Sequence, residues 1–189
     1  MNEHRNLTST KTTAFLVFGI VIFTVLLTST VWPTTTITPP AAFATFLSDC
    51  GEDVTIEGTV GNDILVGTSG NDVIDGISGD DTISGLAGND LICGSLGTDN
   101  INAGSGHDVV FADSRFGGSG NDVVNGGSGN DELFGRQGND QMNGGSGNDE
   151  LDGETGNDRL TGNSGTDDAD GGDGSDDSCV AETEINCET

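Results

Sequence analysis

Aspartate recurs every nine residues over most of the chain, and this regular spacing of one short carboxylate is its clearest chemical signature. The series runs from Asp63 to Asp176, with one longer interval between Asp108 and Asp122. Its members are Asp63, Asp72, Asp81, Asp90, Asp99, Asp108, Asp122, Asp131, Asp140, Asp149, Asp158, Asp167 and Asp176. Each carboxylate offers two hard oxygens, and Ca²⁺ takes about six to eight such ligands, whereas Zn²⁺ prefers His and Cys. The spacing therefore favours a row of sites for a hard cation such as Ca²⁺.

A regular acidic row has a simpler explanation, namely a solvated face with no ligand. Such a face would accept Glu, Asn or Ser, yet all thirteen positions of the series are Asp. The short, stiff side chain holds its oxygens at a fixed radius, and carbonyl oxygens of nearby turns can add further ligands. The invariance favours cation ligands over a solvated face.

The aspartates occupy the sixth position, or slot 6, of a nine-residue repeat. Six units fill residues 58–111, five residues intervene at 112–116, and seven units fill residues 117–179. Slot 4 is Gly in all thirteen units, slot 1 is Gly in twelve, and slot 5 is Asn in eight. Because Gly tolerates positive φ, the paired glycines predict a tight turn, and slots 7 to 9 predict a short strand.

The core must come from slot 8, the one position that is regularly apolar. It is Ile, Leu, Val or Met in eleven of the thirteen units. A single unit cannot bury such a side chain, but stacked units align these residues into continuous columns, so we predict an all-β solenoid. The column residues are Leu65, Ile74, Ile83, Ile92, Ile101, Val110, Val124, Leu133, Met142, Leu151 and Leu160.

The pattern Gly-Gly-x-Gly-x-Asp-x-apolar-x resembles the RTX, or haemolysin-type, calcium-binding nonapeptide repeat. The resemblance covers 117 of the 145 residues after Ala44. It implies a right-handed parallel β-roll in which two repeats make one coil and Ca²⁺ lies between the turns of neighbouring coils. It also implies that the thirteen aspartates are the carboxylate ligands and that main-chain carbonyls of slots 1 to 4 complete each site.

Some units depart from the family pattern. Bulky residues in slot 2 cast doubt on the turn geometry of their units, and these residues are Ile77, Leu86, Arg136 and Glu154. Sites beside the insertion at 112–116 and at both ends of the solenoid should lack a stacking neighbour. Asp63, Asp167 and Asp176 are therefore the weakest of the predicted ligands.

Acidic residues dominate the composition, with 32 Asp and Glu against 5 Lys and Arg and a net charge of −27. After Ala44 the chain has 3 basic and 31 acidic residues, which gives 3 − 31 = −28. Such a field repels phosphate backbones and anionic lipids, which excludes nucleic acid as a partner. Without cations the carboxylates repel one another, and one buried side chain per unit cannot offset the chain entropy. We expect a largely disordered chain that folds cooperatively on binding several Ca²⁺ ions.

Residues 1–44 have the composition of a signal peptide or a membrane anchor followed by a Thr/Pro stalk. An apolar run of fourteen residues, Ala14 to Leu27, follows Arg5 and Lys11, and Ala42–Ala44 offers small residues for cleavage. This length suits the apolar region of a signal peptide, whereas a spanning helix needs about 18 residues or more. A cleaved signal, a retained anchor and a buried core helix all remain open. The first two predict export to the cell surface or the extracellular space, with membrane contact only through an uncleaved N-terminal segment.

Segments 45–57 and 180–189 flank the repeats and are predicted to cap the solenoid. The four cysteines, Cys50, Cys93, Cys179 and Cys187, allow three pairings. Because solenoid ends need protection, we favour Cys50–Cys93 and Cys179–Cys187, and secreted RTX family members have similar flanking cysteines. A metal–thiolate site is disfavoured because the sequence has no Cys-x-x-Cys and no accompanying His.

The sequence gives no support for catalysis. Its two histidines are His4 and His107, of which His107 is expected to be a solvated turn residue, and no HExxH, GxSxG or P-loop motif occurs. Only 28 residues after Ala44 lie outside the repeats. We therefore predict an exported, non-enzymatic calcium-binding β-roll that serves as a cell-surface or extracellular structural or adhesive module and binds surface or matrix components. The alternative is a secretion or stability accessory module of an RTX enzyme or toxin system.

Outward-facing residues of the first block predict one further surface. If alternate units form opposite sheets, Val73, Leu91 and Val109 in slot 7 form an apolar stripe on one sheet. We expect segment 41–47 or a partner to cover this stripe, and the alternative is ordinary apolar scatter on a surface. An ice- or mineral-binding face would need a regular outward row of Thr or Asn, which the sequence lacks.

Overall fold

The computed structural model describes residues 50–51 and 53–187. The predicted signal or anchor at 1–44, the covering segment 41–47 and the first residues of the cap 45–57 lie outside the described residues. Within the described part of the chain, no helix is long and apolar enough to cross a membrane.

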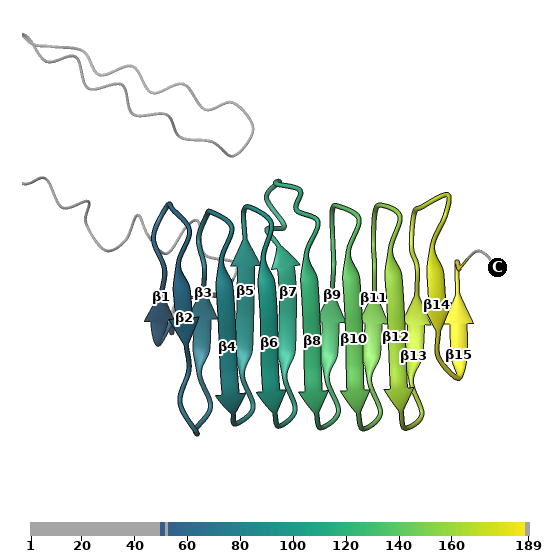
Figure 1. Ribbon diagram of the computed structural model, residues 1–189, viewed down its shortest axis with the longest axis horizontal. Coiled ribbons are helices and arrows are strands. Elements are labelled where there is room, and N and C mark those ends of the chain that lie inside the picture. The colour runs from purple at the N-terminus through teal and green to yellow at the C-terminus, as the bar shows by residue number, and fades with distance from the viewer. Residues whose placement is uncertain (1–49, 52, 188–189) are drawn as a thin grey trace, which may run out of the picture. The chain divides into compact units, whose positions relative to one another are not determined.

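Two parallel sheets face each other in the described chain, one of eight strands and one of seven (Figure 1). The strands are β1 (Ile56–Glu57), β2 (Ile64–Val66), β3 (Val73–Asp75), β4 (Thr82–Ala87), β5 (Leu91–Ser95), β6 (Asn100–Ser105), β7 (Val109–Asp113), β8 (Val123–Ser128), β9 (Glu132–Phe134), β10 (Gln141–Ser146), β11 (Glu150–Asp152), β12 (Arg159–Ser164), β13 (Asp168–Asp170), β14 (Ser178–Val180) and β15 (Thr183–Ile185). Odd-numbered strands form one sheet and even-numbered strands the other. The chain therefore changes sheet after every unit, which confirms the predicted parallel β-roll.

Strands in neighbouring coils pair slot for slot, so the slot 8 side chains stack inside the solenoid. Ile74 pairs with Ile92 in one sheet, and Val124 pairs with Met142 in the other. These and the other central column residues are almost completely buried and form one apolar cluster. The structure thus confirms the columns and divides them between the sheets. Only Leu65, in the outermost strand of its sheet, is half-buried.

The five extra residues of the chain do not separate two complete blocks, as the predicted insertion at 112–116 implied. Ala112 and Asp113 continue β7, where Asp113 is the register partner of Ser95 in β5. The extra length widens the turn between β7 and β8, and the next strand returns to register with Asn100 opposite Val123. Strand pairing decides this placement, because continuing the ladder keeps the backbone of residues 112–113 hydrogen-bonded. Stacking is therefore unbroken across the widened turn.

The last unit is also shifted, by one residue. Leu160 pairs with Cys179 rather than with Ser178, so that the sulfur-containing side chain continues the apolar column. After this unit β15 adds one more strand beside β13. The C-terminal segment thus extends the sheet.

Two disulfides join the cysteines in the favoured pairing. Cys50 is linked to Cys93 with a Cα–Cα separation of 5.9 Å, and Cys179 is linked to Cys187 at 5.8 Å. The first bond ties the segment before β1 to β5, two strands into the sheet. The second closes a short loop around β15.

The bulky residues in slot 2 keep the turn geometry at the cost of a strained backbone. Ile77, Leu86 and Arg136 have φ values of 71°, 77° and 74°, in the left-handed region that glycines occupy in other units. Each such residue costs on the order of 1 kcal/mol or more. Units with bulky residues in slot 2 therefore follow the same turn path as units with Gly in that slot.

The buried columns predict that shortening an inward apolar side chain destabilises the fold far more than shortening an outward one. Leu133→Ala should lower the free energy of unfolding by about 2–5 kcal/mol, because its fully buried side chain leaves a cavity. Ile64→Ala, which shortens a side chain that is 80% exposed, should change it by less than about 0.5 kcal/mol. Denaturant unfolding in saturating calcium measures both values, and equal effects would contradict the assignment of the column.

Candidate metal centre

The slot 6 aspartates form two rows, one along each edge of the solenoid. In each row the Oδ1 atom of one Asp accepts a hydrogen bond from the main-chain N–H of the Asp one coil earlier. Asp63 N–H donates to Asp81 at 2.8 Å, and Asp72 N–H donates to Asp90 at 2.8 Å. The first row contains Asp63, Asp81, Asp99, Asp122, Asp140, Asp158 and Asp177. The second row contains Asp72, Asp90, Asp108, Asp131, Asp149, Asp167 and finally Glu182.

The end of the first row corrects one predicted site residue. Asp176 is exposed, and Asp177 takes the buried position and accepts the hydrogen bond from Asp158 at 2.8 Å. The cause is the one-residue shift of the last unit, which moves its carboxylate together with Cys179. The expected gaps beside the insertion are also wrong, because Asp99 N–H donates to Asp122 at 2.7 Å across the widened turn.

The second oxygen of most row aspartates is buried without a hydrogen-bond partner. The affected atoms are Oδ2 of Asp81, Asp90, Asp99, Asp108, Asp122, Asp131, Asp140, Asp149, Asp158 and Asp167. Each of these residues is at most 3% exposed. A buried charged oxygen without a donor is strongly unfavourable, and a cation would remove this cost.

The slot 1 glycines leave the space into which these oxygens point. A Cβ added at Gly76 would lie 2.5 Å from Asp81 Oδ2 and 2.6 Å from the carbonyl oxygen of Gly94 in the next coil. The same combination of carboxylate and carbonyl oxygen recurs at Gly85, Gly135 and Gly153. Apart from Gly117 at the widened turn, slot 1 glycines do not have positive φ, so their role is to keep this oxygen-lined space open.

Slot 4 glycines have a different role, which matches the turn explanation drawn from the sequence. Most have positive φ, for example 119° at Gly79 and 146° at Gly138. A Cβ there would also strike the main chain of the preceding coil. Close stacking on a preceding coil therefore requires Gly in this slot, whereas Gly61 and Gly70 of the first coil have open space at the Cβ position.

Burial makes the row carboxylates poor anions in the absence of metal. Burial, with a smaller contribution from neighbouring carboxylates, raises the pKa of Asp122 to about 8 and the pKa of Asp99 and Asp140 to about 7. Burial likewise raises the pKa of Asp131 and Asp158 to about 6. Main-chain hydrogen bonds oppose these shifts without cancelling them. The two rows of mutually repelling carboxylates therefore need bound protons or cations to be stable.

The first coil satisfies its carboxylates with protein donors instead. Thr59 donates to Asp63 Oδ2 from its main-chain N–H at 2.6 Å and from its hydroxyl at 2.8 Å. Thr68 donates to Asp72 Oδ2 in the same way, at 2.7 and 2.9 Å. Both threonines occupy slot 2 without the left-handed backbone seen there in later units. Sequence reasoning missed these caps, although Thr in slot 2 occurs only in these two units.

A second ladder, in slot 5, also joins the coils. The side-chain oxygen of Asn71 accepts from Asn89 N–H at 2.9 Å, and that of Asn139 accepts from Asn157 N–H at 2.9 Å. His107, expected to be a solvated turn residue, is exposed but takes part in this ladder, with Nδ1 accepting from Asn130 N–H at 2.8 Å. The preference for Asn in slot 5 is thus explained by coil-to-coil hydrogen bonding.

The donor atoms of the rows fit Ca²⁺. Hard carboxylate and carbonyl oxygens line most of the slot 1 glycine spaces, and Ca²⁺ prefers such ligands. Among the described residues, no three His, Cys, Asp or Glu side chains converge on one point, so main-chain oxygens must complete each site. The twelve predicted slot 6 ligands other than Asp176 stand in the rows. Their binding of metal stays a prediction, with Asp63 and Asp72 the least suited because threonines already satisfy them.

Comparison with known proteins finds one family. The model of the RTX calcium-binding nonapeptide repeat matches four segments, at residues 57–92, 75–110, 116–151 and 143–177. Together these segments cover more than half of the chain. No curated protein matches the sequence.

The glycine spaces predict that adding one methyl group in slot 1 weakens calcium binding, whereas adding one elsewhere does not. Gly76→Ala should bind at least one Ca²⁺ fewer and need more calcium to fold, because the Cβ fills the space beside Asp81 Oδ2. Ala103 shows that the backbone accepts Ala in slot 1. The control is Gly70→Ala, whose Cβ would have no atom nearer than 3.8 Å. Calcium titration with mass spectrometry measures both, and equal behaviour would exclude the glycine space as the site.

The raised pKa values predict that the metal-free fold prefers acid. With folded pKa values of about 6 to 8 against 3.8 as the ordinary value, the folded chain binds more protons than the unfolded chain in between. The free energy of unfolding should therefore fall as the pH rises from about 4 through about 8. Circular dichroism in EDTA should show most residual β-structure at about pH 4 and progressively less toward pH 8. A β-signal that grows with pH in EDTA would contradict this result.

Proposed function

This chain belongs to the family of RTX calcium-binding nonapeptide repeat proteins, and from that membership we propose that it is an exported protein whose β-roll folds when it binds Ca²⁺. The role that follows is structural or adhesive, at the cell surface or outside the cell. Calcium binding itself belongs to the family, and export and the role outside the cell are the proposal.

The buried, partnerless oxygens carry this proposal. Ten of them lie in two continuous rows inside a chain of net charge −27. In the absence of metal the rows repel, and each unit buries one apolar side chain to offset the entropy of nine ordered residues. The free energy of binding calcium would then be the free energy of folding.

This linkage would confine folding to calcium-rich surroundings. Extracellular calcium modules bind with dissociation constants of about 10⁻⁴ to 10⁻³ M, which is far above the calcium concentration inside cells. A chain of this kind would stay unfolded during export and fold outside. The two disulfides support the same compartment, because such bonds persist in oxidising surroundings.

A structural role suits the described surface better than catalysis. The row carboxylates are buried between stacked turns, where a substrate cannot reach them. The outward slots change from apolar to charged along the eight-stranded sheet, as in the register series Leu91, Val109 and Glu132. Such a long, rigid surface is suited to holding partners or neighbouring copies.

A calcium titration tests the proposal. After EDTA treatment at pH 7.5 the chain should lack a β-type circular dichroism spectrum, and millimolar Ca²⁺ should restore it cooperatively, whereas equal Mg²⁺ should not, because Mg²⁺ retains its waters. Asp140→Asn should raise the calcium midpoint several-fold, and Asp168→Asn, at an exposed position, should leave it unchanged. An unchanged β-spectrum in EDTA would refute folding on calcium binding.

A further inference from the structure

Asp113 is a buried carboxylate that the nine-residue pattern does not explain. It ends β7, in register with Ser95, at the start of the widened turn. Its side chain is 0% exposed, although it lies outside slot 6. Burial of an acidic group in a turn needs a partner for both oxygens.

Only one oxygen of Asp113 has such a partner. Its Oδ2 accepts from Gly120 N–H at 3.1 Å, and its Oδ1 has no hydrogen-bond partner, like the orphaned oxygens of the rows.

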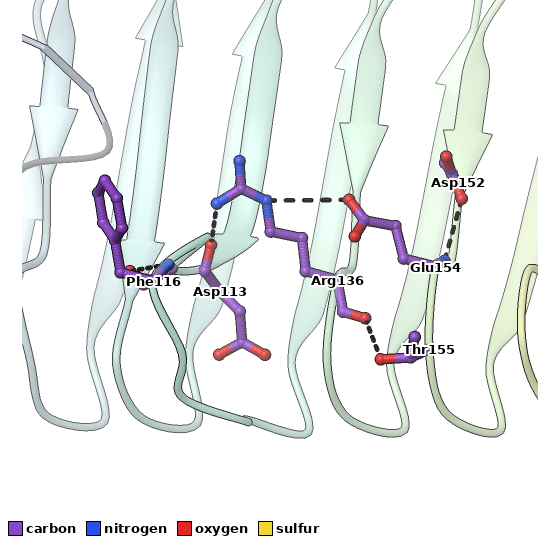
Figure 2. A network of polar contacts seen from close by, with 7 residues as sticks. Asp113, Phe116, Arg136, Asp152, Glu154 and Thr155 are labelled. Carbon is purple, nitrogen blue, oxygen red and sulfur yellow. Dashed lines mark hydrogen bonds and ion pairs between the residues drawn. The ribbon is translucent and has the colours of Figure 1, made fainter. Parts of the chain in front are cut away.

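The neighbouring arginine is directed elsewhere. Arg136 donates from its guanidinium to the carbonyl oxygen of Asp113 at 2.8 Å, lies 3.9 Å from Glu154 and stacks 4.4 Å above the ring of Phe111. Figure 2 shows the carboxylate of Asp113 on the opposite side of this residue from the guanidinium. The orphaned oxygen thus faces the turn.

An oxygen of the first row lies at the same turn. Gly120, whose N–H donates to Asp113 Oδ2, lies directly beside the carboxylate of Asp122 as well. The space beside Gly120 is lined by the carbonyl oxygen of Gly97 and by Asp122 Oδ1. A carboxylate from outside the repeat therefore adds to a group of hard oxygens.

The widened turn also lacks the usual glycine space. Since Cys93 pairs with Phe111 and Ser95 with Asp113, Ala112 stands opposite Gly94 in slot 1 of its coil. At this register the widened turn therefore has a methyl group, as the unit of Ala103 does, and the buried carboxylate of Asp113 follows directly after it.

We propose that Asp113 and Asp122 together bind one Ca²⁺ ion at the widened turn, in a site that no repeat unit forms by itself. Asp113 Oδ1 and the carboxylate of Asp122 are the charged ligands, and main-chain oxygens such as that of Gly97 complete the shell. Affinity in such sites rises with the number of charged ligands, so this ion binds more tightly than those of ordinary repeat units. The inference rests on the proposed calcium-dependent folding.

Removal of one charge tests the site in the full chain. Asp113→Asn keeps an acceptor for Gly120 N–H and loses the anionic ligand. Native mass spectrometry across a calcium titration should show one bound ion fewer and loss of the tightest binding step. The matched control is Asp75→Asn, because Asp75 is 2% exposed, lies outside slot 6 and accepts from Ile77 N–H at 3.0 Å and Ser95 Oγ at 2.9 Å. This control should bind as many ions as the unmodified chain.

A double variant separates a shared site from two independent ones. Asp122→Asn should lose the same ion, and Asp113→Asn combined with Asp122→Asn should lose no second ion. An Asp113→Asn chain that binds the full number of ions, or folds at lower calcium because repulsion is relieved, would overturn the shared site. An unmodified chain that binds no calcium would instead overturn the proposed function.

A second variant keeps the test decisive if the Asp113→Asn chain fails to fold. Asp113→Ser introduces the residue that the preceding coil has at the same register, Ser95, and the same ion count applies to it. Loss of one site among many should leave the coil intact. Failure of both variants to fold in saturating calcium therefore counts against the proposal.

Discussion

A buried carboxylate with only one satisfied oxygen is the constraint on which this solenoid depends. After the first coil, one oxygen of each row aspartate from Asp81 to Asp167 joins its coil to the preceding one, and this bond holds the other oxygen inside the turn without a donor. The remaining features follow from that geometry. Slot 1 is Gly in all units but one because a Cβ would enter the space into which the oxygen points, and the slot 4 glycines let the turns touch. The free energy of folding then depends on what neutralises the rows.

The periodic part of the fold could be predicted from the sequence because every unit repeats the same local solution. Slot 8 at Ile92 and Leu133 marks the column, and alternation along the strand fixes the outward neighbours. The invariance of the slot 6 aspartates indicated that they do not form a solvated face, and they are buried. The slot 1 glycines were recognised for the wrong reason, since a preference for positive φ and a need for empty space leave the same residue in the sequence.

The departures could not be predicted, because neighbouring coils rather than local sequence decide them. Counting in nines assigns Asp176 to the row, but the pairing of Cys179 with Leu160 moves Asp177 there. Counting also treats residues 112–116 as a spacer, whereas ladder hydrogen bonds draw Ala112 and Asp113 into β7. Glu182 completes the second row from the C-terminal segment because its longer side chain reaches Asp167 N–H at 2.9 Å.

The covalent link between Cys50 and Cys93 has a kinetic consequence. It closes a loop of 43 residues that contains the opening coils, so these strands remain neighbours after the ions have gone. The disulfide thereby lowers the loop-closure entropy that the N-terminal coils lose when they refold. The disulfide Cys179–Cys187 spans only 8 residues and therefore removes less loop-closure entropy at the C-terminal end. Refolding should therefore nucleate at the N-terminal coils and propagate coil by coil toward β15.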